Sequence, residues 1–161
     1  MHIGQLLRRK GHEVATIDGS RSVRDALAVL TERRIGALVV SADGRRIDGI
    51  LSERDIARGL HDRGAGLLGD PVAGVMTAEV HTCGPGVQLT DLARLMTDER
   101  VRHVPVVEDD VLVGIVSIGD VVKARLDELE EERRRLVDYI QTVRTGRSGA
   151  SGPRRGPFLP A

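Results

Sequence analysis

A short motif that occurs twice constrains this chain more than any other feature of its sequence. Residues 49–55 read Gly-Ile-Leu-Ser-Glu-Arg-Asp, and residues 114–120 read Gly-Ile-Val-Ser-Ile-Gly-Asp. In both copies an apolar run leads into a serine, and an aspartate follows three residues later, where a helix N-cap belongs. Each copy therefore predicts a buried strand that turns sharply into a helix. A hydroxyl and a carboxylate at such a corner can face one cleft.

The segments around this motif are duplicated as well. Three of them recur 66 positions later: 14–17 as 80–83, 23–34 as 89–100, and 35–41 as 101–107. After the hairpin the offset falls to 65, because the second turn is one residue shorter. Hydrophobic periodicity and turn residues give each copy the order strand, helix, strand, strand, helix. Residues 72–77 precede the second copy as residues 3–8 precede the first, so the chain is an internal duplication.

The size of the repeat predicts how the two copies pack. A repeat of roughly 60 residues is too small to bury its sheet well alone. We therefore expect an α+β fold in which two α/β-type repeats pack their sheets about an approximate two-fold axis, with two equivalent clefts between them. The predicted boundaries are repeat 1 at 3–64, a linker at 65–71, repeat 2 at 72–126, an extended C-terminal helix at 127–143 and a disordered tail at 144–161.

Composition argues against several classes of partner. The chain has 24 basic and 24 acidic residues, so no net field draws it towards nucleic acid or an anionic membrane. Its aromatic residues are Tyr139 and Phe158, which argues against binding single-stranded nucleic acid by stacking. No apolar segment approaches the roughly 20 residues needed to span a bilayer, and the N-terminal apolar run is too short for a signal peptide. A single cysteine, Cys83, favours a reducing compartment, and we expect a cytoplasmic protein.

The sequence offers no catalytic or metal-binding pattern. Its five histidines have no ligand spacing: His2, His12, His61, His81 and His103. Cys83 has no base paired with it in the sequence and is better explained as a small packed residue than as a nucleophile. Glycine-rich phosphate loops and activated serine signatures are missing as well. We predict a protein that is not an enzyme, binds no metal and requires no cofactor.

Four features together resemble a tandem pair of CBS domains, also called a Bateman module. They are the two Gly-x-x-Ser-x-x-Asp corners, the Val-x-Thr strand starts at Thr16 and Thr82, the segment Arg-His-Val-Pro-Val-Val at 102–107, and Val-Met-Thr at 75–77. The resemblance covers residues 3–126. Within the family, the chain looks like small stand-alone bacterial CBS-pair proteins, to which no enzyme or transporter domain is attached.

The resemblance implies that adenine nucleotides (AMP, ADP or ATP), or adenosyl compounds such as NAD(H), bind in the two clefts as regulatory ligands. It assigns the ribose hydroxyls to Asp55 and Asp120, and it places Ser52 and Ser117 near ribose or phosphate. The adenine would lie against strands of the other repeat. Cleft A would consist of Thr16, Ile35, Ala37, Ser117 and Asp120. Cleft B would consist of Thr82, Val101, His103, Pro105, Ser52, Arg54 and Asp55.

Three residues are candidates to receive phosphate: Arg54, Arg102 and His103. Because Arg102 and His103 alternate along a predicted strand, only one of them should face a given cleft. In the first repeat their place is taken by Gly36 and Ala37. We therefore expect the two clefts to differ in affinity, and one could be empty.

The same residues also have purely structural interpretations. Asp55 and Asp120 could act only as N-caps, worth about 1 kcal/mol each. Ser52 and Ser117 could only close a turn. The two threonines that start the strands could be ordinary strand residues.

The last helix is predicted to run to about Val143. Arg133 takes the one position of its helical 3–4 spacing that is not apolar. The apolar residues at the other positions are Val122, Leu126, Leu129, Leu136, Ile140 and Val143. Such a seam can pair with another helix, or the helix can fold back on its own domain or on a partner's. Beyond it, the arginines of the tail could touch an acidic partner, although a solvated tail is the simpler interpretation. The family resemblance implies a homodimer.

The resemblance implies a regulatory, energy-sensing protein that binds adenosyl ligands and reports cleft occupancy to an unidentified effector protein. The alternative is a structural or interaction dimer, whose clefts are filled by side chains and whose C-terminal helix docks a partner. A small enzyme is the third hypothesis.

Overall fold

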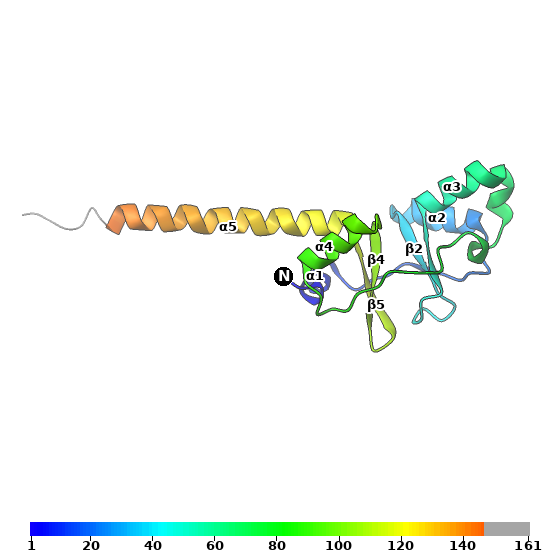
Figure 1. Ribbon diagram of the computed structural model, residues 1–161, viewed down its shortest axis with the longest axis horizontal. Helices are drawn as coiled ribbons and strands as arrows, with labels where there is room; N and C mark the ends of the chain where they lie inside the picture. Colours follow the sequence, from blue (N-terminus) through cyan, green and yellow to red (C-terminus); the bar gives the residue numbers. More distant parts are fainter. Residues whose placement is uncertain (147–161) are drawn as a thin grey trace, which may run out of the picture. The chain divides into compact units, whose positions relative to one another are not determined.

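The computed structural model describes residues 1–146, and the remainder of the predicted tail, 147–161, lies outside the described part. The chain divides into two compact units, a first from Met1 to Val122, which contains repeat 1 and repeat 2 up to Val122, and a second that begins at Lys123. Figure 1 colours the chain along its sequence, from blue at the N-terminus towards red at the C-terminus. The first repeat holds α1 (Ile3–Lys10), β1 (Thr16–Ile17), α2 (Val23–Arg33), β2 (Ala37–Val40), β3 (Gly49–Ser52) and α3 (Glu53–Arg63). It is followed by η1 (Gly64–Gly69), η2 (Val72–Gly74), α4 (Leu89–Asp98), β4 (His103–Glu108), β5 (Val111–Ser117) and α5 (Ile118–Gly146).

Each repeat contributes its own sheet. In the first, β1 pairs with β2 in parallel and β2 pairs with β3 antiparallel; in the second, β4 pairs with β5 antiparallel. The strand expected at 80–83 is reduced to a single bridge between Cys83 and Val106. Gly84 and Pro85 follow at once, and both residue types weaken a β-ladder. The second repeat therefore keeps the predicted order with a shortened first strand.

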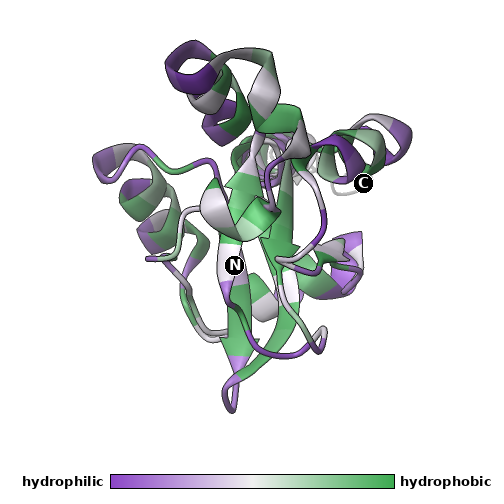
Figure 2. Ribbon diagram, turned by 90° about the vertical axis from the view of Figure 1, so that its right-hand side faces the viewer, coloured by the Kyte–Doolittle hydropathy of each residue, from purple (hydrophilic) through white to green (hydrophobic). Residues whose placement is uncertain are grey.

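The core is aliphatic and lies between the strands and the inner faces of the helices. All four residues of β2 are buried. One face of α2, carrying Val23, Ala26 and Leu30, packs into the same cluster as Leu38 and Leu51. In Figure 2 the hydrophobic colour gathers on the central strands, and the hydrophilic colour marks the outer turns of the helices. This separation is the one expected when helical and strand periodicities face a shared core.

The two repeats exchange their leading segments. Residues 3–10, which precede repeat 1 in the sequence, bind repeat 2, and residues 70–77 bind repeat 1. The hydrogen bonds recur at equivalent positions: Ile3 N–H to Val87 O (2.9 Å) matches Val72 N–H to Arg21 O (2.8 Å), and Gly4 N–H to Pro85 O (2.7 Å) matches Ala73 N–H to Gly19 O (2.9 Å). Each repeat therefore binds the segment that precedes the other repeat in the sequence.

The first glycine of each corner motif makes room for this exchange. A Cβ atom at Gly114 would lie 2.7 Å from both terminal methyl carbons of Leu7 in α1. A Cβ atom at Gly49 would lie 2.5 Å from Sδ of Met76 and 2.8 Å from the carbonyl oxygen of Thr77. Only a residue without a side chain allows such close approach of another segment.

α5 continues three residues beyond the predicted end at Val143, so the start of the predicted tail is helical. In the part that belongs to the second unit, the exposed large apolar side chains are Leu126, Leu129, Leu136, Val137, Tyr139, Ile140 and Val143. Charged residues on this part form ion pairs: Arg125 with Glu128, Arg134 with Glu130, and Arg135 with Glu131. Across residues 1–146, no helix has both the length and the apolar character that crossing a membrane would require.

The exchange predicts that Gly49→Ala destabilises the fold by about 1–3 kcal/mol, as overpacking usually does. The new Cβ would press on the backbone of Thr77, whose N–H and carbonyl both pair with Ile50. Equilibrium urea denaturation measures the loss. Gly119→Ala is the control, because its Cβ would meet Ser117 Oγ at 3.6 Å, an ordinary van der Waals distance. An equal loss of stability in both variants would contradict this role for Gly49.

Candidate functional site

The serine of the first corner, and not the aspartate, is the N-cap of the helix that follows. α3 begins at Glu53, and Ser52 Oγ accepts the backbone N–H of Asp55 at 3.2 Å. Asp55 Oδ2 in turn accepts the backbone N–H and the hydroxyl of Ser52, each at 2.9 Å. These reciprocal bonds form a capping box, so the prediction of Asp55 as the N-cap is wrong by three positions.

The second corner has the same arrangement. α5 begins at Ile118, and Ser117 Oγ accepts the backbone N–H of Asp120 at 3.2 Å. Asp120 Oδ2 accepts the backbone N–H of Ser117 at 2.8 Å. Asp120 is therefore also the third helical residue and not the N-cap. In both corners, capping fixes the carboxylate at the edge of a cavity.

Cleft A is a cavity of about 630 Å³ built from both repeats. Four of its predicted residues line it: Ile35 and Ala37 from repeat 1, and Ser117 and Asp120 from the corner of repeat 2. The lining also includes three cationic residues that were not predicted: Lys10, Arg33 and Arg34. Cleft A therefore joins an apolar strand of one repeat to the carboxylate of the other.

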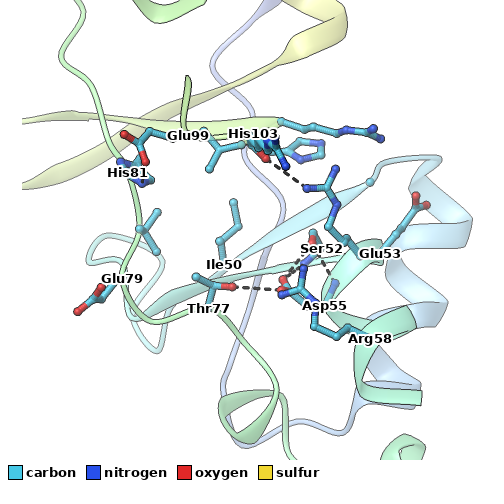
Figure 3. Close-up of a pocket in the computed structure, with 16 residues that line it drawn as sticks. Ile50, Ser52, Glu53, Asp55, Arg58, Thr77, Glu79, His81, Glu99 and His103 are labelled. Carbon is cyan, nitrogen blue, oxygen red and sulfur yellow. Dashed lines mark hydrogen bonds and ion pairs between the residues drawn. The ribbon is translucent and has the colours of Figure 1, made fainter. Parts of the chain in front are cut away.

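Cleft B is a cavity of about 500 Å³ with the repeats in reversed roles. Five of its predicted residues line it: Ser52, Arg54, Asp55, Val101 and His103. Figure 3 places Asp55 between Ser52 and Thr77 on one side of the cavity, and His81, Glu99 and His103 on the other. Both cavities fall within the range of roughly 300–1,000 Å³ that is usual for small-molecule sites.

Three predicted residues do not line the cavity to which they were assigned. Thr16 and Thr82 are exposed, and the preceding residues, Ala15 in cleft A and His81 in cleft B, line the cavities in their place. Successive side chains of an extended segment point to opposite sides, so a shift of one position exchanges the faces. Pro105 is buried within β4, where its carbonyl oxygen accepts the N–H of Cys83.

Lys10 forms an ion pair with the carboxylate of cleft A. Its ammonium group lies 2.6 Å from Asp120 Oδ2 and 2.7 Å from the carbonyl oxygen of Ile115, and both charged side chains are 26% exposed. Burial alone would raise the pKa of Asp120, but the hydrogen bond and charge of Lys10, with the bonds from Ser117, hold that pKa below its usual value. The sequence missed Lys10 because 110 positions separate it from Asp120.

The phosphate candidates Arg54, Arg102 and His103 all line cleft B. The prediction that Arg102 and His103 cannot face the same cleft is wrong. β4 begins only at His103, and Arg102 lies in the bend before it, where strand alternation does not apply. Arg54 donates to the carbonyl oxygen of Arg100 at 3.2 Å, so its position is fixed by repeat 2.

His103 lies where the two clefts meet, because it and Gly36 line both cavities. A Cβ atom at Gly36 would lie 3.3 Å from Cε1 of the imidazole, so the ring rests against the backbone of the first repeat. Burial lowers the pKa of His103, and this effect outweighs the nearby carboxylates of Glu53 and Asp120, which act to raise it.

Cys83 lies outside the residues that line the two clefts. Burial raises the pKa of its thiol to about 11, so the thiol is protonated at neutral pH. A protonated thiol is a poor nucleophile and a poor metal ligand. Among the described residues, no group of three or more histidine, cysteine, aspartate or glutamate side chains is placed to hold a metal ion.

Comparison with a family model finds the CBS domain twice in this chain, over residues 3–62 and 72–127. A curated relative is the CBS domain-containing protein CBSX3, mitochondrial, of Arabidopsis thaliana, which is 40% identical over 124 residues. The match covers 74% of this chain and 60% of the relative, so the chain spans less than two thirds of that protein's length.

Solved structures show the same fold. The CBS-domain containing protein ATU1752 from Agrobacterium tumefaciens is 42% identical, with a TM-score of 0.75 over 78% of this chain and 99% of that chain. The CBS domain pair of protein MJ0100 was solved in complex with 5′-methylthioadenosine and S-adenosyl-L-methionine. It is 23% identical, with a TM-score of 0.68 over 77% of this chain and 98% of that chain, a likeness that concerns the fold alone.

The lowered pKa of His103 predicts a loss of stability on acidification. The folded state binds this proton more weakly than the unfolded state, so stability is complete above the unfolded pKa of about 6.5 and falls as the pH drops towards the lower folded pKa. His103→Gln should flatten this part of the profile, measured by urea denaturation between pH 7.5 and pH 5. His61→Gln, at an exposed position of α3, is the control. Parallel profiles for His103→Gln and the parent protein would contradict the prediction.

Proposed function

The chain belongs to the CBS domain family, as its sequence motifs predicted, and we propose that it is a regulatory module that binds adenosyl ligands in clefts A and B. The observation that carries this proposal is the shared construction of each cleft, in which a corner carboxylate of one repeat stands opposite strand residues of the other. A ligand in either cleft would contact both repeats. It could therefore bias the way they pack, if it binds one arrangement more tightly than another.

The chemistry of the clefts suits an adenosine group. A carboxylate has lone pairs for both hydroxyls of a ribose, and Asp55 and Asp120 supply one carboxylate to each cleft. Aliphatic side chains can lie against the base: Ile35 and Ala37 in cleft A, and Val101 in cleft B. Both ligands in the MJ0100 complex contain adenosine, which supports the same ligand class for this chain. The candidates are AMP, ADP, ATP and NAD(H), besides these two compounds.

Cleft B also offers groups for phosphate oxygens. Arg54, Arg102 and His103 line it, and we assign them this role. Two further arginines, Arg58 and Arg100, line the same cavity. Guanidinium groups form short, charge-assisted hydrogen bonds with phosphate and are the usual choice for such contacts.

We further propose that the protein is a homodimer held by α5. The apolar stripe of this helix, defined as Leu126, Leu129, Leu136, Ile140 and Val143, is exposed and has coiled-coil spacing. A second copy fits this stripe by charge as well. In a parallel pair, Arg125 of each copy would face Glu130 of the other, and Arg133 would lie beside Glu132 of the other.

This arrangement gives a route from ligand to output. Asp120 lies in the first turn of α5, and the same helix carries the apolar stripe. A ligand that moves Asp120 would act on the start of the helix through which the copies pair. An effector protein that binds this pair could then respond to cleft occupancy.

The first test is stabilisation by ligand. At a hundredfold excess over the dissociation constant, a bound adenosyl ligand should add about 2.7 kcal/mol to the free energy of unfolding. Thermal shift with AMP, ADP, ATP, NADH and S-adenosylmethionine measures this, with guanosine monophosphate as a control for the base. Asp55→Asn and Asp120→Asn should each weaken binding to one cleft by about tenfold, because a charged hydrogen-bond acceptor is lost.

Indifference of the parent protein to every compound would overturn this function and favour a structural dimer whose clefts hold no ligand. Equal binding by the parent protein and by both variants would show that the carboxylates are not the ribose contacts.

The second test concerns the dimer. The double variant Leu129→Glu/Leu136→Glu should convert a dimer into a monomer at micromolar concentration, because it places charges in the apolar seam. Light scattering coupled to size exclusion measures the mass. Gln141→Glu adds a negative charge outside the stripe and should leave the dimer intact. A monomeric parent protein, or a dimer that survives the double variant, would contradict pairing through α5.

A further inference from the structure

Lys10 in cleft A makes the contacts that Thr77 makes in cleft B. The backbone N–H of Thr77 donates to the carbonyl oxygen of Ile50 (2.9 Å), and its hydroxyl donates to Asp55 Oδ1 (3.1 Å). The ammonium of Lys10 donates to the equivalent carbonyl, that of Ile115 (2.7 Å), and to the equivalent carboxylate, Asp120 (2.6 Å). The charged ammonium of Lys10 therefore takes the place of two neutral donors, the backbone N–H and the hydroxyl of Thr77.

The exchange of leading segments explains this correspondence. Leu7 and Met76 lie over the equivalent glycines of the two corners, so α1 and residues 72–77 occupy the same place on opposite repeats. From that place, Thr77 reaches its carboxylate directly as part of a β-bridge to Ile50. The chain in α1 stays helical, and the long side chain of Lys10 spans the remaining gap.

The replacement gives the two carboxylates different electrostatic surroundings. Asp55 accepts its hydrogen bonds from neutral groups, namely the N–H and hydroxyl of Ser52 and the hydroxyl of Thr77. Asp120 accepts one bond from the N–H of Ser117 and one from a full positive charge. The ion pair with Lys10 thus neutralises the carboxylate of cleft A. The hydrogen bond from Thr77 is neutral and does not offset the charge of the carboxylate in cleft B.

We propose that Lys10 makes cleft A selective for adenosyl ligands that carry a phosphate over the corresponding neutral nucleoside. This inference rests on the proposed function, in which Asp120 receives the ribose. Asp120 Oδ2 already accepts bonds from Lys10 and Ser117, so a ribose that donates one hydroxyl to each carboxylate oxygen competes with the ammonium of Lys10 for Oδ2. Ligand entry therefore displaces Lys10 from a contact in which both side chains are about three quarters buried.

The displaced ammonium needs a new partner, because an unpaired charge in a partly buried site is costly. A phosphate supplies that partner and leaves Asp120 to the ribose, whereas a neutral nucleoside supplies none. Arg33 and Arg34 line the same cavity and add to its positive charge, although Arg33 is already paired with Glu13 at 3.2 Å. Lys10 thus acts as a counter-ion that changes its partner when a phosphorylated ligand binds.

The experiment measures the affinities of AMP and adenosine by isothermal titration calorimetry. Asp55→Ala serves as the background, because it removes the carboxylate of cleft B and isolates cleft A. In this background AMP should bind more tightly than adenosine. Adding Lys10→Met should lower the ratio of the two affinities by about tenfold, through weaker binding of AMP and equal or tighter binding of adenosine. Lys10→Gln, which keeps hydrogen-bond donors but loses the charge, should behave in the same way.

Arg8→Met is the matched control, because it removes a charge from the same helix at an exposed position that lines neither cleft. It should leave the ratio unchanged, and Lys10→Arg should preserve most of it. If both compounds bind and the ratio survives Lys10→Met and Lys10→Gln, the inference is overturned and the proposed function stands. If the parent protein binds neither compound nor any other adenosyl ligand, the proposed function fails and this inference fails with it.

Discussion

The structure depends on the backbone hydrogen bonds through which each repeat holds the leading segment of the other. Two sets of bonds, from Ile3 and Gly4 to repeat 2 and from Val72 and Ala73 to repeat 1, repeat the same geometry. Each set brings a segment against a glycine at the start of a corner motif. A small repeat that cannot bury its sheet alone gains the missing cover from its neighbour. The interlocking of the repeats is therefore a condition of folding and also the origin of the two clefts.

The exchange also makes the clefts chemically different. The leading segments meet the corner carboxylates at equivalent places, but one brings Lys10 and the other brings Thr77. Asp120 thereby gains an ion pair, and Asp55 gains a neutral hydrogen bond. A duplicated sequence can in this way diverge in ligand preference through residues that lie outside the duplicated corners. Arg102 lines cleft B alone and His103 lines both clefts, so Arg102 and Lys10 are two residues that distinguish the clefts.

Much of the fold could be predicted because periodicity and repetition are local signals. The recurrence of 14–41 as 80–107 fixed the order of the elements, and the apolar runs marked the strands. The exchange itself was out of reach, since nothing in residues 3–8 tells which repeat they will contact. Lys10 was missed for the same reason, because its partner lies 110 positions away. Long-range pairing between similar segments is the information that a single sequence lacks.

The errors at the site have a different cause, which is the position of element ends. Thr16 and Thr82 were assigned to the clefts from a strand pattern, and a shift of one residue places Ala15 and His81 there. Arg102 lines cleft B because the strand starts one residue after it. In the same way, a helix that begins one residue after the serine turns an expected N-cap aspartate into the third helical residue. Local patterns identify an element more surely than they locate its first residue.

The capping box joins the two interpretations of the corner aspartates that the sequence left open. The two roles exclude each other only if the carboxylate must break its capping hydrogen bond in order to bind a ligand. Here the backbone N–H of the preceding serine holds Oδ2 of each aspartate at 2.8–2.9 Å and thereby fixes the direction in which the carboxylate faces. A fixed carboxylate loses less conformational entropy when it binds a ligand than a mobile one does. The bonds that stabilise the start of each helix therefore also prepare its carboxylate for binding.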